Sequence, residues 1–103
     1  MIRSKISGVG YYVPENIVKN SDLEEMMNTS DQWIKERTGI KERRWVNDNK
    51  LTTSLMGTYA SEEAIRDAGI DKNDIDFIIF TTLSPDYYFP GSGVLLQLSL
   101  IHI

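Results

Sequence analysis

The stretch TSLMGTYASEEAIRDAGIDKNDIDFIIFTTL, residues 53 to 83, decides the fold class of this chain. Its first half has the apolar spacing of a helix, which we expect over residues 53 to 68. Its second half contains DFIIFTTL, residues 76 to 83, a continuous apolar run that is typical of a strand covered on both faces. Because a further strand is expected over residues 3 to 13, the order strand, long helix, buried strand predicts an α/β architecture.

Particular residues predict the ends and one face of the long helix. Thr52 or Thr53 is the expected start, and Gly69 followed by the apolar Ile70 is the expected Schellman-type end. The residues that recur every four positions on one face are Met56, Ala60, Ala64 and Ala68. Small side chains at this spacing let a helix lie close to a sheet or to another helix, so we interpret this face as structural.

The N-terminal segment RSKISGVGYYV, residues 3 to 13, is rich in β-branched and aromatic residues and is followed by Pro14, which indicates a strand. Gly8 and Gly10 inside it predict a bulge or the close approach of another backbone. A dinucleotide-binding fingerprint would need its third glycine where this chain has Val13, so that interpretation is excluded.

Two short helices are predicted between these regions. Asn20 is the expected N-cap of a helix over residues 21 to 27. Ser30 is the expected N-cap of the second helix, and Gly39 is its expected C-terminal stop. The segment ERRWV, residues 42 to 46, fits either a short strand or an extended loop.

The second of these helices carries a tryptophan among charged residues. Trp33 and Arg37 stand one turn apart on the same face, while Ile34 points roughly 100° away. One helix face therefore presents an aromatic ring and a guanidinium side by side. The tryptophan is either the core anchor of a short surface helix or a platform for a flat ligand.

The charge of the chain restricts its partners. The net charge is −4, from 15 acidic and 11 basic side chains, which argues against general nucleic-acid binding. Positive charge nonetheless gathers in residues 35 to 44, where a small anionic ligand and a solvated basic loop are equally good explanations. The basic residues of this segment are Lys35, Arg37, Lys41, Arg43 and Arg44.

Several other kinds of site and segment are missing from the sequence. The chain has no cysteine, so Cys-based metal sites, disulfides and a thiol nucleophile are excluded within it. The N-terminus lacks the apolar region of a signal peptide, and no stretch approaches 18 apolar residues. We therefore expect a soluble, cytoplasmic protein that does not bind a membrane.

The segment SPDYYFPGSG, residues 84 to 93, is a loop dense in proline, glycine and aromatic residues. A loop beyond the C-terminal end of a buried strand is a usual place for ligand contacts. An ordered turn packed by its own tyrosines is an equally good interpretation. Ser84 and Ser92 have no nearby histidine, so we interpret both as turn residues.

Taken together, four stretches resemble the N-terminal part of the ketoacyl-acyl-carrier-protein synthase III family, which starts bacterial fatty-acid synthesis. They are, in order, GVGYYVPENIVKNSDLE, TSDQWIKERTGIKERR, TSLMGTYASEEAIRDAGI and DFIIFTTLSPDYYFPGSG. The resemblance covers residues 1 to about 97. It implies that residues 1 to 97 form a partial N-terminal domain of an α/β fold, the thiolase-like layered αβαβα fold, which is incomplete in this chain.

The resemblance also implies a reaction. In this family a cysteine, a histidine and an asparagine carry out a decarboxylative Claisen condensation between an acyl-CoA and malonyl-acyl-carrier protein. The coenzyme A thioester is a substrate, no resident cofactor or metal is implied, and the family forms homodimers. All three catalytic residues lie further along the family's chain than this sequence extends. We therefore expect no catalytic residue here and no activity from these 103 residues alone.

Four residues match binding positions of the family. Trp33 matches the position whose indole stacks on the adenine of CoA, Arg37 one that grips the nucleotide from the other side, and Thr29 a third CoA contact. Phe89 matches a position that reaches across the dimer interface and shapes the partner's acyl pocket. The residues around Phe89 differ from the family's pattern, so the acyl-chain preference is open.

The resemblance stops after VLLQ, and residues 98 to 103 read LSLIHI. This hexapeptide matches a translation of the transposon mosaic-end adapter used in shotgun sequencing libraries. We expect it to be a sequencing artefact on a truncated reading frame, with a genuine apolar strand as the alternative. His102, the only histidine, is therefore not counted as a site residue. The source nucleotide read distinguishes the two.

Two other functions stay open. A condensing enzyme of secondary metabolism with a different acyl donor or acceptor would share the CoA-binding motif. A small stand-alone module that binds CoA or another adenine nucleotide would require the chain to be complete and stable. We expect instead that the strand at residues 76 to 83 is partly uncovered and that the chain expressed alone is insoluble or loosely folded.

Overall fold

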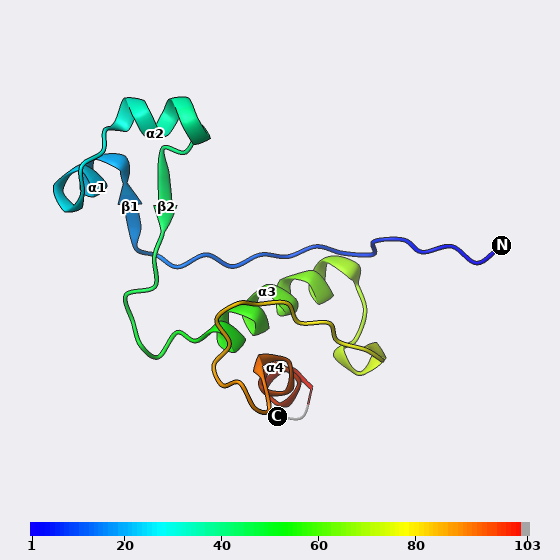
Figure 1. Cartoon of the computed structure of the whole chain (residues 1–103). Coiled ribbons are helices and arrows are strands. Elements are labelled where there is room, and N and C mark those ends of the chain that lie inside the picture. The colour runs from blue at the N-terminus through cyan, green and yellow to red at the C-terminus, as the bar shows by residue number, and fades with distance from the viewer. Residues whose placement is uncertain (102–103) are drawn as a thin grey trace. The chain divides into compact units, whose positions relative to one another are not determined.

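The computed structural model describes residues 1 to 101 and contains two compact units (Figure 1). The first unit consists of Met1–Tyr12 and the chain from Lys50 onward, and the second of Val13–Asn49. In chain order the described elements are β1 (Ile17–Lys19), α1 (Asn20–Met26), α2 (Asp31–Thr38), β2 (Glu42–Arg44), α3 (Thr53–Ala68), the 3₁₀ helix η1 (Lys72–Asp74) and α4 (Ser92–Leu100).

The second unit consists of a two-stranded antiparallel sheet and two short helices. β1 pairs with β2 so that Val18 lies opposite Arg43. The segment at residues 42 to 46 thus contains a short strand, one of the two forms expected for it. Helix α2 begins where the Ser30 hydroxyl accepts the N–H of Trp33 and ends at Gly39, whose φ of 72° is left-handed. Both ends agree with the prediction.

Asn20 was predicted to be the N-cap of α1, and this prediction is wrong. Asn20 is the first helical residue, and Lys19 is the N-cap. The Asn20 side chain is fully buried. Its amide group donates to Asp31 Oδ1 (2.9 Å) and to the carbonyl of Ile40 (2.8 Å), while its oxygen accepts from Arg43 Nη2 (2.6 Å). A carboxamide both donates and accepts, so in this buried position it joins three segments of the unit rather than capping one helix.

Helix α3 is the central element of the first unit. The Thr52 side chain accepts the N–H of Leu55 at its start, and Gly69, with a φ of 67°, ends it. The N–H of Ile70 donates to the carbonyl of Ile65 (3.4 Å), which is the long hydrogen bond of a Schellman stop. Start and end are both as predicted.

The alanine face of α3 lies against the N-terminal segment. A Cβ atom at Gly8 would overlap the carbonyl oxygen of Ala64, and one at Gly10 that of Ala60. The glycines therefore allow the two backbones to approach, which confirms that this helix face is structural.

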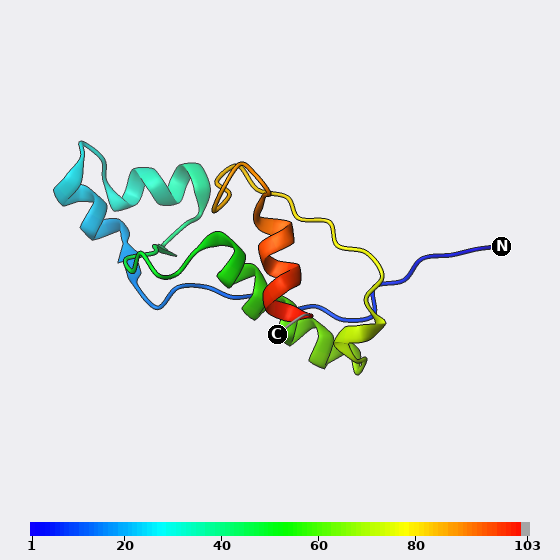
Figure 2. The ribbon, with the colours of Figure 1, turned by 90° about the horizontal axis from the view of Figure 1, so that it is seen from below.

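The strands predicted at residues 3 to 13 and 76 to 83 are not strands in the described part of the chain. Both segments run extended (Figures 1 and 2), but the sheet of the structure contains only β1 and β2. A strand exists only as a ladder with a neighbour. For the N-terminal segment, side chains of α3 provide hydrogen-bond partners instead. Asp67 accepts the N–H of Val9 (3.0 Å), and Glu63 accepts the N–H of Tyr11 (3.4 Å).

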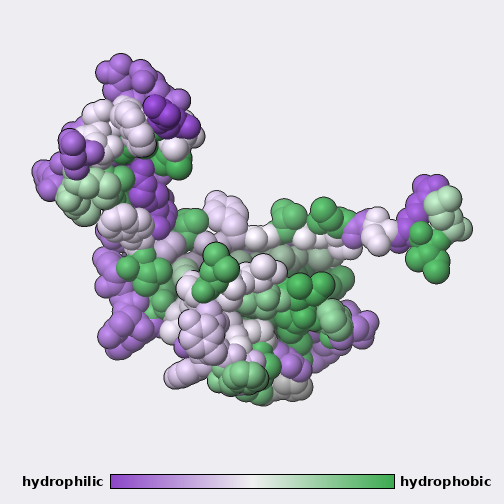
Figure 3. All heavy atoms as spheres, viewed as in Figure 1, coloured by the Kyte–Doolittle hydropathy of each residue, from purple (hydrophilic) through white to green (hydrophobic). Residues whose placement is uncertain are grey.

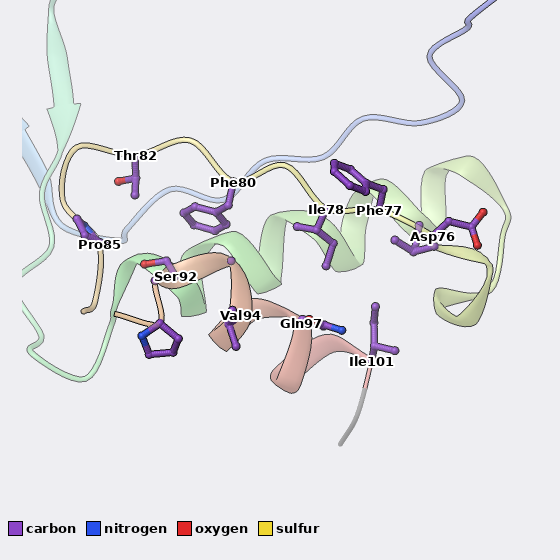
Figure 4. A pocket seen from close by; sticks show the side chains of 14 residues that line it. Asp76, Phe77, Ile78, Phe80, Thr82, Pro85, Ser92, Val94, Gln97 and Ile101 are labelled. Atoms are coloured by element: carbon purple, nitrogen blue, oxygen red, sulfur yellow. The ribbon is translucent and has the colours of Figure 1, made fainter. Parts of the chain in front are cut away.

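The segment at residues 76 to 83 was predicted to be covered on both faces, but in the structure it is covered on only one. Ile78 and Phe80 point toward α4 (Figure 4) and are partly buried. The alternate residues Phe77 and Ile79 are 80% and 83% exposed. The expectation of a partly uncovered segment is therefore confirmed.

Helix α4 was not predicted, because its sequence SGVLLQLSL is too uniformly apolar to show a helical period. It packs on α3, with Leu96 and Leu100 buried. Residues 98 to 100 form its last turn, so they are helical and not a strand, while residues 102 and 103 lie outside the described part of the chain. The adapter origin of residues 98 to 103 stays a prediction. No helix among the described residues is long and apolar enough to cross a membrane.

Candidate functional site

Trp33 lies on the solvent side of α2. Its side chain is 53% exposed, whereas the neighbouring Ile34 is buried. Ile34 therefore anchors the helix to its unit, and the indole ring of Trp33 is available to solvent. Of the two roles left open for the tryptophan, this exposure favours the platform.

Arg37 lies over the ring of Trp33, as their spacing of one turn predicted. The guanidinium carbon is 5.4 Å from the ring centroid, which is a cation–π contact. At an exposed site such a contact stabilises by about 0.5–1 kcal/mol. The arrangement therefore holds a flat ring and a permanent positive charge together.

A small hollow adjoins this ring at the start of α2. Its volume is about 300 Å³, and it is lined by Asn28, Thr29, Ser30 and Trp33. Thr29, Trp33 and Arg37 were predicted as one site. In the structure Thr29 and Trp33 line this hollow, and Arg37 contacts the ring of Trp33. We refer to these three residues as the α2 platform.

A larger hollow of about 550 Å³ lies in the first unit, between residues 75 to 82 and α4 (Figure 4). Its lining includes Ile78, Phe80 and Val94, and it contains none of the predicted CoA contacts. Because it lies on the partly covered side of an extended segment, we interpret it as packing space, despite its larger volume.

Part of the basic surplus in residues 35 to 44 is used within the unit. Arg43 donates to the carbonyl of Val18 (3.2 Å) as well as to Asn20, and Arg44 donates to the carbonyl of Pro14 (2.9 Å). These two arginines are thus part of the packing of the unit.

Lys35 also has a partner on its own helix, because its ammonium group lies 2.7 Å from Asp31 Oδ2. This hydrogen bond, followed by the one from Asn20, lowers the pKa of Asp31. The Lys35 charge is therefore balanced locally, and Arg37 remains the cation that lies on the indole ring.

Phe89 belongs to the first unit and is 93% exposed. Its predicted role in a partner's acyl pocket stays a prediction. Ser92 is buried and hydrogen-bonded to Asp86, and the Ser84 carbonyl accepts from Thr53 Oγ1 (2.6 Å), so both serines have structural partners.

Asp86 is the residue of this region that the sequence interpretation missed. An aspartate in a proline-rich loop is ordinarily a turn residue. Its partner Ser54 lies 32 residues earlier in the chain, so no local pattern connects the two.

The comparisons with known proteins concern the chain as a whole. No family model matches the chain. A solved structure of 3-oxoacyl-[acyl-carrier-protein] synthase III from Aquifex aeolicus matches with a TM-score of 0.87 and 45% identity, over 93% of this chain and 30% of that one. The priming β-ketosynthase of the R1128 polyketide pathway matches with a TM-score of 0.86 and 31% identity, over 93% of this chain and 28% of that one.

These folds define the class as thiolase-like condensing enzymes, and the chain is a small α/β part of one. The β-ketoacyl-[acyl-carrier-protein] synthase III of Chlamydia pneumoniae is 52% identical over 98 residues, which is 95% of this chain and 29% of that protein. The chain belongs to the β-ketoacyl-[acyl-carrier-protein] synthase III family. It spans about 30% of the length of the relatives it matches.

Proposed function

We propose that this chain supplies the coenzyme A contacts of a β-ketoacyl-[acyl-carrier-protein] synthase III, and that the complete enzyme condenses an acyl-CoA with malonyl-acyl-carrier protein. The observation that carries the proposal is the exposed indole of Trp33 with the guanidinium of Arg37 over it. An aromatic ring binds a flat base, and a permanent cation attracts the phosphates of the same nucleotide.

The energies favour a base on this ring. Base stacking on an aromatic side chain contributes about 1–3 kcal/mol. An incoming base would either displace Arg37 from the ring or bind to the other face of the ring. The contact between Arg37 and the ring contributes only about 0.5–1 kcal/mol. Thr29 adds a hydroxyl beside the ring, in the hollow at the start of α2.

The chemical step requires residues that this chain does not have. The family reaction transfers the acyl group from CoA to a cysteine, and the chain contains no cysteine. In this proposal the chain binds and orients the donor, and the nucleophile belongs to another part of the enzyme. A cytoplasmic homodimer in which Phe89 shapes the partner's acyl pocket is part of the same proposal, and it rests on the family resemblance.

Calorimetric titration of CoA into the full-length enzyme tests the binding role. We expect Trp33→Ala to weaken CoA binding roughly 5- to 100-fold, because the stacking surface is removed, and Trp33→Phe to retain most of the affinity. Arg37→Gln should weaken binding less and reduce its dependence on salt. Trp45→Ala is a matched control, because Trp45 is a partly exposed tryptophan of the same unit. Equal affinities for the wild type and Trp33→Ala would exclude the platform.

The likeness to the polyketide priming ketosynthase supports a second candidate, a condensing enzyme of secondary metabolism. Both candidates bind CoA, so the donor and acceptor distinguish them. Condensation of acetyl-CoA with malonyl-acyl-carrier protein of the fatty-acid pathway supports the first. Activity only with another acyl donor or another carrier protein supports the second.

A further inference from the structure

The carboxylate of Asp86 joins the first turns of two helices. Its Oδ1 accepts from the N–H of Ser54 (2.7 Å) and from the hydroxyl of Ser92 (2.8 Å), and its Oδ2 accepts from the hydroxyl of Ser54 (2.6 Å). The N–H of Asp86 donates to Ser92 Oγ (2.9 Å). Ser54 and Ser92 are 8% and 3% exposed. We refer to Asp86, Ser54 and Ser92 as the aspartate clamp.

The position of the clamp explains why an acidic residue stands there. Ser54 lies in the first turn of α3, and Ser92 is the first residue of α4 (Figure 4). The N-terminus of a helix carries partial positive charge and unpaired N–H groups, so both helix starts favour a carboxylate. A further hydrogen bond from Thr53 Oγ1 to the carbonyl of Ser84 (2.6 Å) holds the beginning of the same loop.

The clamp holds the two ends of a loop, and the side chains at the tip of this loop are largely exposed to solvent. Between Asp86 and Ser92 lie Tyr87, Tyr88 and Phe89, which are 64%, 88% and 93% exposed. Side chains this exposed have few contacts of their own to hold them. Among the described residues, the loop is therefore held mainly at the two points where it is attached.

We propose that Asp86 is a positioning residue: it holds the aromatic loop between α3 and α4 so that Phe89 projects in one direction, and through Phe89 it sets which acyl chains the enzyme accepts. The second half of this inference rests on the proposed function, while the first half concerns the loop alone. Asp86 itself has no contact with substrate in this scheme.

Hydrogen exchange of the full-length enzyme tests the first half without any assay of activity. We expect Asp86→Ala to raise the exchange of the Tyr87, Tyr88 and Phe89 amides at least ten-fold, while the amides of α2 keep their protection. Asp76→Ala is the matched control, because Asp76 is an exposed aspartate of the same unit. Unchanged exchange at Tyr87 to Phe89 would overturn the positioning role.

The second half is tested by the preference between a short and a long acyl-CoA, measured as the ratio of their kcat/KM values. We expect Asp86→Ala and Phe89→Ala to shift this ratio in the same direction. The double variant should shift it no further than Phe89→Ala alone, because both changes act through one side chain. An equal loss for both donors, with an unchanged ratio, would mean that Asp86 only stabilises the fold.

A milder pair of variants keeps the test informative if Asp86→Ala does not fold. Ser92→Ala removes one arm of the clamp, and Ser92→Thr keeps the hydroxyl. Faster exchange at the loop in Ser92→Ala, restored in Ser92→Thr, supports the inference, and identical exchange in both contradicts it. The two proposals fail separately: an unchanged CoA affinity in Trp33→Ala excludes the platform, whereas the exchange experiment decides the clamp.

Discussion

Two neighbouring residues of α2 have opposite roles. Ile34 is buried and attaches the helix to its unit, and Trp33 is half exposed with Arg37 over its ring. An exposed aromatic ring of this size has an energetic cost in water, which the arginine partly offsets while no ligand is bound. A flat anionic ligand on this pair is what we propose, and the CoA titration tests it.

Asp86 makes stability depend on pH. Burial raises the pKa of its carboxyl, but hydrogen bonds from Ser54, Ser92 and Thr52 lower it more, so that the pKa falls to about 2. A carboxyl with a pKa below its unfolded value of 3.8 contributes stability above pH 4, and this is lost as the pH falls toward 2.

This pH dependence is measured by urea unfolding of the full-length enzyme and of Asp86→Asn between pH 7 and pH 2. The difference in unfolding free energy between the two should be constant above about pH 5 and should shrink toward zero near pH 2. A difference that does not change over this range would show that the carboxylate charge is not what holds the clamp.

At the scale of elements, α3 is packed on two sides by small residues. Gly8 and Gly10 let the N-terminal segment lie on its alanines, and Gly57 leaves room for Phe80 and Leu96 on another side. A Cβ atom at Gly57 would lie 2.8 Å from the Phe80 ring. Flexible side chains border Gly57, whereas backbone atoms, which cannot give way, border Gly10.

We therefore expect Gly10→Ala to destabilise the full-length enzyme by about 2–3 kcal/mol, because the new methyl group meets the backbone of α3. Gly39→Ala is the comparison: its φ is left-handed, but nothing lies within 4 Å of the added atom, so only the backbone strain of about 1–2 kcal/mol applies. Urea unfolding measures both. A smaller loss for Gly10→Ala than for Gly39→Ala would contradict close packing.

At the scale of the whole molecule, the apolar core is small. Only Val18, Ile34, Leu96 and Leu100 are buried apolar side chains among the described residues. Apolar atoms remain on the visible surface of the first unit (Figure 3), and the large exposed side chains of its extended segment are Phe77, Ile79 and Leu83. Extended backbone beside exposed apolar side chains promotes pairing with other chains.

For this reason we expect the 103-residue chain, expressed alone, to be insoluble or loosely folded. Size-exclusion chromatography and a thermal melt measure this directly, with the full-length enzyme as the control. A soluble monomer with a sharp cooperative melt would contradict the expectation and would favour the stand-alone binding module.

The sequence by itself determined the ends of α2 and α3 and the pairing of Trp33 with Arg37. Caps such as Ser30, Gly39 and Gly69, and neighbours one helical turn apart, act within about four residues, so their effect is written in the local pattern.

Only the tertiary structure decided the roles of Asn20 and Asp86 and the state of the extended segments. Asn20 meets Arg43 across 23 residues, and Asp86 meets Ser54 across 32. A strand likewise needs a neighbour that no local pattern identifies. Interactions between distant parts of the chain depend on which segments fold together, and for that reason the sequence alone did not predict them.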